Sequence, residues 1–162
     1  MTNRRTICLR IVLWLLVVLW MGLIFSFSAQ NADSSREVSG RVIRWLLTIL
    51  DRQFSELPPE EQLLRMSGWS TIVRKLAHFG LFAVLGILSF AAFSAILPPQ
   101  RAFLAALGLG TVRAILDEVQ QAFVPGRSCE FRDICIDAAG VLLGAAFLLL
   151  ILHLIQRKKL KR

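Results

Sequence analysis

The sequence has no tyrosine and contains only two histidines and three cysteines among its 162 residues. The odd number of cysteines does not indicate a disulfide framework. The two histidines, His78 and His153, are predicted to lie toward opposite membrane faces, which excludes a metal site built on a histidine pair. A glycine-rich phosphate loop and a nucleophile elbow are also missing from the sequence. The sequence therefore predicts no cofactor and no metal ion.

Apolar residues are abundant, at 56% of the chain, and the mean hydropathy is +0.62. A chain of this composition is too apolar for one soluble core and is typical of a membrane protein. A bilayer core needs about 20 apolar residues per helix. Four segments meet or approach this length, at about 11–28, 76–97, 102–124 and 133–152. We therefore expect an all-α membrane protein with four transmembrane helices, forming a single domain over residues 1–162.

The first apolar segment has two possible interpretations. Arginines precede it and the small residues Ser26 and Ser28 end it, as in a removed signal peptide. Its uncharged run of 18 residues with Trp14 and Trp20 is longer than a usual signal core, which favours a retained span.

Basic residues flank the expected spans on one side. They are Arg4, Arg5 and Arg10 before the first span, Arg101 between the second and third, and the closing QRKKLKR. Because positive flanks favour the cytoplasm, we expect both termini to be cytoplasmic. The net charge of +8 is then explained by topology and by attraction to anionic lipid, and nucleic-acid binding is not expected.

The predicted outer loop, residues 29–75, contains an amphipathic pattern between Arg36 and Arg52. The apolar residues that share one helical face are Val38, Val42, Trp45, Leu46, Ile49 and Leu50. This pattern predicts an amphipathic helix on the outer membrane surface between spans 1 and 2. The stretch PPEEQLLRM predicts the start of a second, short helix. Both helices either connect and cover the spans or take part in binding.

Ionisable residues interrupt the last three expected spans, and all but Arg113 fall in their outer halves. Helical spacing places Lys75 and Arg74 with His78, Asp117 and Glu118 with Gln121, and Asp133 with Asp137. Charges in a membrane are costly unless they face the bundle interior. We therefore expect these faces to meet in one polar cavity beneath the outer surface, with Arg113 paired to Asp117.

At these residues the chain resembles the VanZ-like family of bacterial membrane proteins, named for a protein associated with teicoplanin resistance. The resemblance is carried by FSAQ at Phe27 to Gln30, RKLAHF at Arg74 to Phe79, and DEVQQAFVPGR at Asp117 to Arg127, followed by Asp133, Asp137, Gly140 and Gly144. Two positions depart from it, Phe82 where the family often has tyrosine and Asp137 where it often has asparagine. The resemblance implies a protein of the bacterial plasma membrane. It also implies an outward-facing polar site made of Lys75, His78, Glu118, Gln121, Arg127 and Asp133, without implying a reaction.

Each candidate residue has a structural alternative. His78 is a candidate catalytic proton carrier or a hydrogen-bonded helix contact. Glu118 is a candidate base or one half of an ion pair with Lys75 or Arg127. Arg127 suits a phosphate or carboxylate ligand, or caps the last span through Asp133. We interpret Gly140 and Gly144 as a face for close helix packing.

The leading functional hypothesis is a site that binds or modifies an amphiphilic envelope component, such as a lipid-linked precursor or a lipid-tailed antibiotic. The expected partners are membrane lipids or lipid-linked envelope molecules, and the resemblance adds lower susceptibility to lipoglycopeptides such as teicoplanin. One alternative is a proton-coupled transporter or channel subunit that uses Glu118 and His78. Another is a structural partner in an envelope assembly. The sequence does not decide whether a reaction is catalysed.

Overall fold

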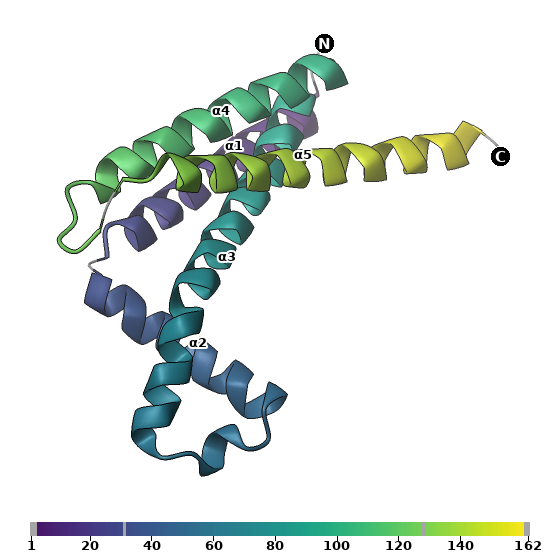
Figure 1. Cartoon of the computed structure of the whole chain (residues 1–162). Helices are drawn as coiled ribbons and strands as arrows, with labels where there is room; N and C mark the ends of the chain where they lie inside the picture. The colour runs from purple at the N-terminus through teal and green to yellow at the C-terminus, as the bar shows by residue number, and fades with distance from the viewer. Residues whose placement is uncertain (1–2, 31, 128, 161–162) are drawn as a thin grey trace.

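The fold is taken from a computed structural model that describes residues 3–30, 32–127 and 129–160, with the side chains of 32–38 and 160 left undescribed. Within these ranges the chain is helical and has no strand. The elements are α1 (Arg4–Ser28), α2 (Ala32–Leu50), the short 3₁₀ helix η1 (Phe54–Glu56), α3 (Pro59–Ser94), α4 (Pro99–Gln121) and α5 (Phe131–Leu160), as Figure 1 shows. The all-α prediction is confirmed.

Helix α3 is the central element of the protein. It packs against α1, α2, α4 and α5, and α4 also contacts α1 and α5. Figure 1 shows that α3 crosses the bundle obliquely and that its first half projects outward to meet α2. The two ends of the chain lie on the same side of the molecule, away from the loop that joins α4 to α5.

Three helices of the described chain are long and apolar enough to cross a membrane, namely α1, α3 and α5. Apolar side chains such as Val18 and Leu19 are well exposed on α1, as expected for a surface in contact with lipid. Helix α4 does not reach the same apolarity, because Arg101, Arg113 and the pair Asp117 and Glu118 fall within its 23 residues. The membrane prediction is therefore supported, and a fourth span remains a prediction.

The boundaries of α3 differ from the sequence prediction. We expected a short helix near Pro59 and a separate span from residue 76, but α3 continues unbroken through 36 residues. Pro59 in the first turn, followed by Glu60 and Glu61, starts the helix favourably. The next proline in the sequence is Pro98, so no proline ends the helix at the position where its hydropathy changes. Helices α1 and α5 likewise extend beyond the predicted spans 11–28 and 133–152, whereas α4 covers 99–121 where 102–124 was expected.

Helix α2 forms where the amphipathic pattern predicted a helix. Its buried residues are Ile43 and Leu47, which pack with Phe54 and with Met66 of α3. Most of the predicted apolar face stays exposed, including Trp45 at 63%. The side chain of Val38 lies outside the described part of the chain. Helix α2 therefore uses one edge of its apolar surface against α3, and contact of the rest with the membrane remains a prediction.

The closest packing in the bundle joins α3 to α5. A Cβ built on Gly144 would lie 1.9 Å from the carbonyl oxygen of Ala83, and one on Gly140 would lie 2.5 Å from that of Phe79. In the opposite direction, a Cβ on Gly86 would lie 2.3 Å from the carbonyl oxygen of Val141. We call this contact the α3–α5 seam. It confirms the interpretation of Gly140 and Gly144 and adds Gly86, which the sequence analysis missed.

We predict that Gly144→Leu destabilises the protein. The new side chain meets backbone atoms that cannot rotate away, and overpacking of this kind costs about 1–3 kcal/mol or more. Gly108→Leu is the matched control, because a Cβ at Gly108 meets nothing within 4 Å. Thermal unfolding in detergent, followed by tryptophan fluorescence, measures both variants. Equal melting temperatures for the two would contradict the seam.

Candidate functional site

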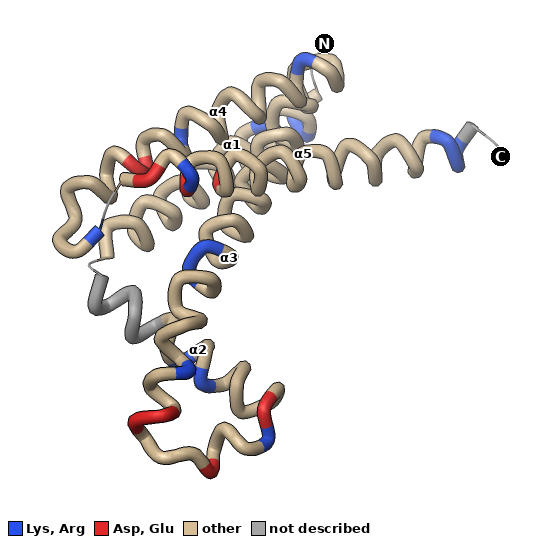
Figure 2. The backbone as a smooth tube through the Cα atoms, in the orientation of Figure 1, with Lys and Arg blue, Asp and Glu red and all other residues tan. Residues whose placement is uncertain are grey.

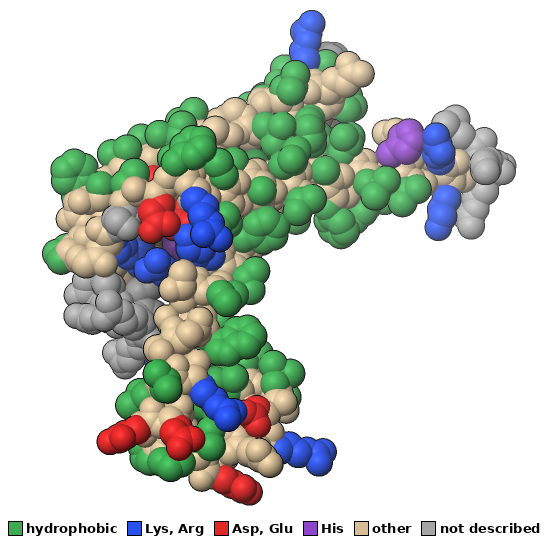
Figure 3. Space-filling model, in the orientation of Figure 1, with side chains coloured by type: hydrophobic (Ala, Val, Ile, Leu, Met, Phe, Trp, Pro, Cys, Tyr) green, Lys and Arg blue, Asp and Glu red, His purple; other side chains and the backbone are tan. Residues whose placement is uncertain are grey.

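Polar side chains gather at one end of the bundle. Figure 2 shows acidic and basic residues concentrated where α4 ends, α5 begins and the middle of α3 passes. Figure 3 shows several of them exposed together on one face, bordered by apolar side chains. Ser28 at the end of α1 completes the group.

We call this group the polar cluster, and its members are Ser28, Arg74, Lys75, His78, Arg113, Asp117, Glu118, Gln121, Asp133 and Asp137. Asp117 contacts several of them, and its side chain is fully buried. Its Oδ2 accepts hydrogen bonds from Ser28 Oγ at 2.7 Å and from Gln121 Nε2 at 2.8 Å. Its Oδ1 lies 2.9 Å from Arg113 Nη2, an ion pair whose geometry is not aligned for a hydrogen bond. The predicted pairing of Arg113 with Asp117 is confirmed. It explains how a charged arginine is accommodated within an apolar helix.

His78 projects from α3 toward two carboxylates. Its Nδ1 lies 3.8 Å from Asp117 Oδ2 and 4.0 Å from Asp137 Oδ2. Asp137 is 1% exposed, and among the described residues its Oδ2 has no hydrogen-bond partner. The three residues come from α3, α4 and α5, so tertiary packing alone brings them together.

Lys75 and Asp133 form an outer bridge between α3 and α5. Lys75 Nζ pairs with Asp133 Oδ1 and lies 3.4 Å from Glu130 Oε2. Two residues that we expected to bind a ligand are thus paired with each other. Asp133 is used by Lys75, so the structure offers no support for Arg127 capping α5 through Asp133.

Glu118 holds the backbone of the α4–α5 loop. Its side chain is 1% exposed, and its Oε2 accepts a hydrogen bond from the backbone N–H of Glu130 at 2.8 Å. Lys75, one of its expected partners, pairs with Asp133 and Glu130 instead. Among the described residues, no ion pair includes Glu118. The local role of Glu118 is therefore to accept a hydrogen bond from the backbone of the α4–α5 loop.

Arg127 lies in that loop, directly after Gly126, whose φ of 77° is a conformation that suits glycine. Its Nη1 donates to the carbonyl oxygen of Ser28 at 3.5 Å, which links the loop to α1. Burial lowers the pKa of Arg127 from its ordinary value, and the nearby charge of Arg74 acts in the same direction. The guanidinium stays protonated, but its environment favours an added negative charge.

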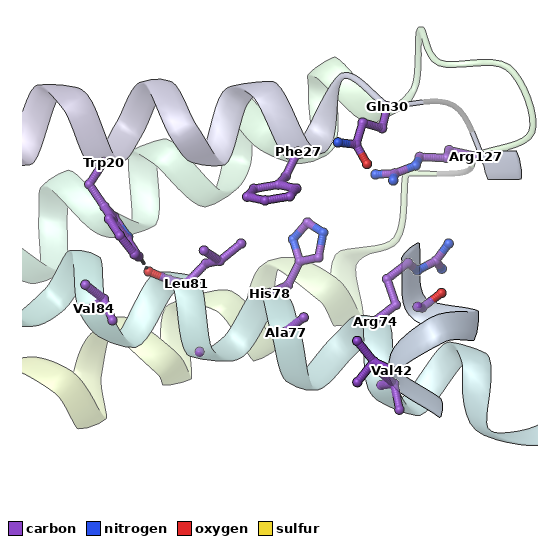
Figure 4. A pocket seen from close by; sticks show the side chains of 13 residues that line it. Trp20, Phe27, Gln30, Val42, Arg74, Ala77, His78, Leu81, Val84 and Arg127 are labelled. Carbon is purple, nitrogen blue, oxygen red and sulfur yellow. Dashed lines mark hydrogen bonds between the residues drawn. The ribbon is translucent and has the colours of Figure 1, made fainter. Parts of the chain in front are cut away.

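A pocket of about 470 Å³ opens between α1, α2 and α3. Figure 4 shows its apolar side chains, which include Trp20, Phe27, Val42, Leu81 and Val84, and its polar end, formed by Gln30, Arg74, His78 and Arg127. Trp20 Nε1 donates to the carbonyl oxygen of Leu81 at 2.8 Å, so the indole is fixed in the wall. We call this space the apolar pocket.

A second cavity, of about 10 Å³, also borders His78. Five of the six predicted site residues line it, namely Lys75, His78, Glu118, Gln121 and Asp133, together with Arg74, Ile136 and Asp137. The sixth, Arg127, lines the apolar pocket instead. His78 and Arg74 line both spaces.

The sequence analysis did not include several residues of this arrangement in the candidate site. Ser28 in the polar cluster and Trp20 and Phe27 in the pocket wall were not anticipated. Arg74, Asp117 and Asp137 were placed on the faces of the expected polar cavity but not among its six site residues. The seven-residue spacing of Trp20 and Phe27 was an available signal, because it places both rings on one face of α1. The pocket itself depends on the angle between α1 and α3.

We predict that Glu118→Gln keeps the protein nearly as stable as the wild type, whereas Glu118→Leu does not. Glutamine retains an oxygen that accepts the Glu130 N–H, and leucine leaves that donor unsatisfied at a cost of about 1–3 kcal/mol. Thermal unfolding of both variants in the same detergent measures the difference. If Glu118→Gln lost as much stability as Glu118→Leu, the result would contradict this role and indicate that the Glu118 carboxylate is paired with a base. Breaking a buried ion pair typically costs roughly 3–5 kcal/mol.

Comparison with known proteins supports the assignment of this chain to a family. Neither the curated proteins nor the solved structures contain a match to it. The family model described as VanZ/LLP1 matches residues 13–153. This range includes every residue of the polar cluster and of the apolar pocket. The chain therefore belongs to the VanZ/LLP1 family.

Proposed function

We propose that this protein binds an amphiphilic component of the bacterial envelope, with an anionic head group against Arg74 and Arg127 and a hydrocarbon chain in the apolar pocket. The observation that carries the proposal is the pocket itself. It combines an apolar wall with two guanidinium groups at one end. A volume of about 470 Å³ also falls within the range of about 300–1,000 Å³ found for ligand pockets.

The polar end of the pocket suits an acidic head group. Arg74 and Arg127 are half-buried, and the charge of Arg74 contributes to lowering the pKa of Arg127. Among the described residues, the buried Nε of Arg127 has no hydrogen-bond partner, and its Nη1 makes only a long bond to Ser28. A phosphate or carboxylate would receive hydrogen bonds from these groups and offset their repulsion.

The apolar wall suits a hydrocarbon chain. Trp20, Leu81 and Val84 extend the pocket along α1 and α3, away from the two arginines. The outer surface of α1 is exposed and apolar, so the end of a long chain would continue into lipid. A ligand with both a charged head and an aliphatic tail therefore fits better than a small soluble anion.

We further propose that α4 is a fourth transmembrane helix. Arg113, Asp117 and Glu118 are all buried against neighbouring helices, so they do not place charge in lipid. The two chain ends lie on one side of the molecule, as an even number of spans requires. With basic residues at both ends, that side is cytoplasmic and the apolar pocket opens toward the outer face of the plasma membrane.

This orientation gives the proposal a physiological consequence. An outward-facing pocket would reach lipid-linked precursors and lipid-tailed antibiotics in the outer leaflet. Sequestering or altering either one would lower susceptibility to a lipoglycopeptide such as teicoplanin.

We predict that Arg127→Gln weakens binding of an anionic lipid by about 10- to 100-fold, the effect of losing hydrogen bonds to a charged group. Native mass spectrometry of the purified chain with dioleoylphosphatidic acid measures binding, and dioleoylphosphatidylcholine serves as the zwitterionic comparison. Arg101→Gln is the matched control, because it removes an equal charge from an exposed position outside the pocket.

Gly80→Leu tests the tail in the same assay. Gly80 lines the pocket and a Cβ there meets nothing within 4 Å, so leucine should fill the pocket without disturbing the fold. We expect it to reduce binding of both lipids. Equal effects of Arg127→Gln and Arg101→Gln, or unchanged binding by Gly80→Leu, would contradict the proposal. Proton-driven flux in vesicles without lipid binding would favour a transporter instead.

We predict that Cys129 reacts with a membrane-impermeant thiol reagent added outside intact spheroplasts and that Cys8 does not. Both are exposed in the structure, so accessibility from one side decides the result. Single-cysteine variants, in which serine replaces the other two cysteines, give each signal separately. Labelling of Cys8 from outside would reverse the orientation and place the pocket on the cytoplasmic side.

A further inference from the structure

We propose that His78, Asp117 and Asp137 together bind one divalent transition-metal cation. A ligand atom from each of the three residues lies within 4.8 Å of the others. This departs from the expectation that the protein uses no metal ion, which considered only a site with both histidines. The structure instead combines one histidine with two aspartates from neighbouring helices.

The buried charges of the cluster favour a cation. Asp117, Glu118 and Asp137 are each at most 1% exposed, and Arg113 is the one buried base among the described residues. Three carboxylates against one guanidinium leave two negative charges in excess when all are ionised. The partly buried Arg127 reduces this excess from the apolar pocket, and Arg74 does so from both cavities. Lys75 also lines the small cavity but pairs with Asp133, and none of the three bases forms an ion pair with Asp137 among the described contacts. Buried charge of this size is costly unless it is paired or coordinates a metal.

Asp137 supplies an independent sign of a ligand. Its Oδ2 is buried and has no hydrogen-bond partner among the described residues, yet it faces His78. Buried carboxylate oxygens are normally satisfied. The cavity of about 10 Å³ borders both Asp137 and His78, and a space of this size holds about one water molecule. A metal-bound water would occupy it.

The surroundings of Asp117 are those of a positioned metal ligand. The oxygen that faces His78 is the one held by Ser28 and Gln121, and Arg113 holds the other oxygen. Metal-binding carboxylates are commonly oriented by hydrogen bonds of this kind. The Ser28 hydroxyl can rotate, so its bond does not prevent coordination.

The ligand types indicate which ions fit. One imidazole nitrogen and two carboxylate oxygens suit Zn²⁺ or Mn²⁺ better than Mg²⁺ or Ca²⁺, which prefer oxygen alone. Ligand atoms around a four-coordinate ion with bonds of about 2.1 Å stand roughly 3.4 Å apart. The distances from His78 Nδ1 to Asp117 and Asp137 are 3.8 Å and 4.0 Å, so small side-chain movements would complete the site.

The first test is a calorimetric titration of the purified full chain with Zn²⁺ after treatment with chelator. Serine replaces all three cysteines in every protein used, so that thiols do not bind the ion. We expect one Zn²⁺ per chain and at least tenfold weaker binding for Asp137→Asn. Asp51→Asn is the matched control, because it removes an equal charge from an acid that pairs with Arg65 and lines neither cavity. It should bind Zn²⁺ like the parent protein.

Folding of the variants is checked in the absence of metal. Asp137→Asn keeps the side-chain shape and removes a buried charge, so its melting temperature without metal should equal or exceed that of the parent. Added Zn²⁺ should raise the melting temperature of the parent and leave that of Asp137→Asn unchanged. Absence of stoichiometric binding by the folded parent, or equal binding by Asp137→Asn, would overturn the proposal and favour a shared proton between the carboxylates.

The second test is pulsed electron paramagnetic resonance of bound Mn²⁺. Coupling to a histidine nitrogen should be present in the parent and lost in His78→Gln. A Mn²⁺ signal without nitrogen coupling would overturn the assignment of His78. Lipid binding is measured separately in the presence of chelator, so the proposed amphiphile site and the proposed metal site can fail independently.

Discussion

Contact between glycines and backbone across the α3–α5 seam is the constraint on which the rest of the structure depends. Gly140 lies against the carbonyl of Phe79, the residue that follows His78, and Asp137 lies one turn before Gly140. The same approach places Lys75 beside Asp133 at the end of the seam. Larger residues at these glycines would separate the helices and remove the contacts among His78, Asp117 and Asp137. The chemistry of the site therefore rests on residues that have no side chain.

Features that depend on local spacing were predictable from the sequence. The pairing of Arg113 with Asp117 and the close approach at Gly144 follow from helical periodicity within one segment. The continuity of α3 was not predicted, because the change in hydropathy near residue 76 was interpreted as a helix boundary. Such a change does not break the backbone hydrogen bonds along a helix. The sequence predicted that the polar faces of three helices meet, but not the specific contacts of His78 with Asp117 and Asp137, which require the relative rotation of those helices. The apolar pocket depends in addition on where α2 packs.

His78 separates two environments of opposite character. The apolar pocket is bordered by Arg74 and Arg127, whereas the other side holds the buried carboxylates of Asp117 and Asp137, with Arg74 at its edge as well. The first environment would attract an anion, as proposed above, and the second would attract a cation. Because His78 lines both, occupancy on one side changes the electrostatic potential felt on the other. Two ligands bound on either side of His78 would therefore influence each other's affinity through the imidazole.

The length of α3 has a mechanical consequence. Its 36 residues extend about 54 Å at 1.5 Å per residue, well beyond a hydrocarbon core of about 30 Å. One end is attached to α2 through Ile43 and Leu47, and no proline interrupts the rod before the bundle. A change in the depth or tilt of α2 would therefore tilt α3 as a rigid body. His78 and Arg74 would move with it, which would make the geometry of the site responsive to the thickness and tension of the surrounding bilayer.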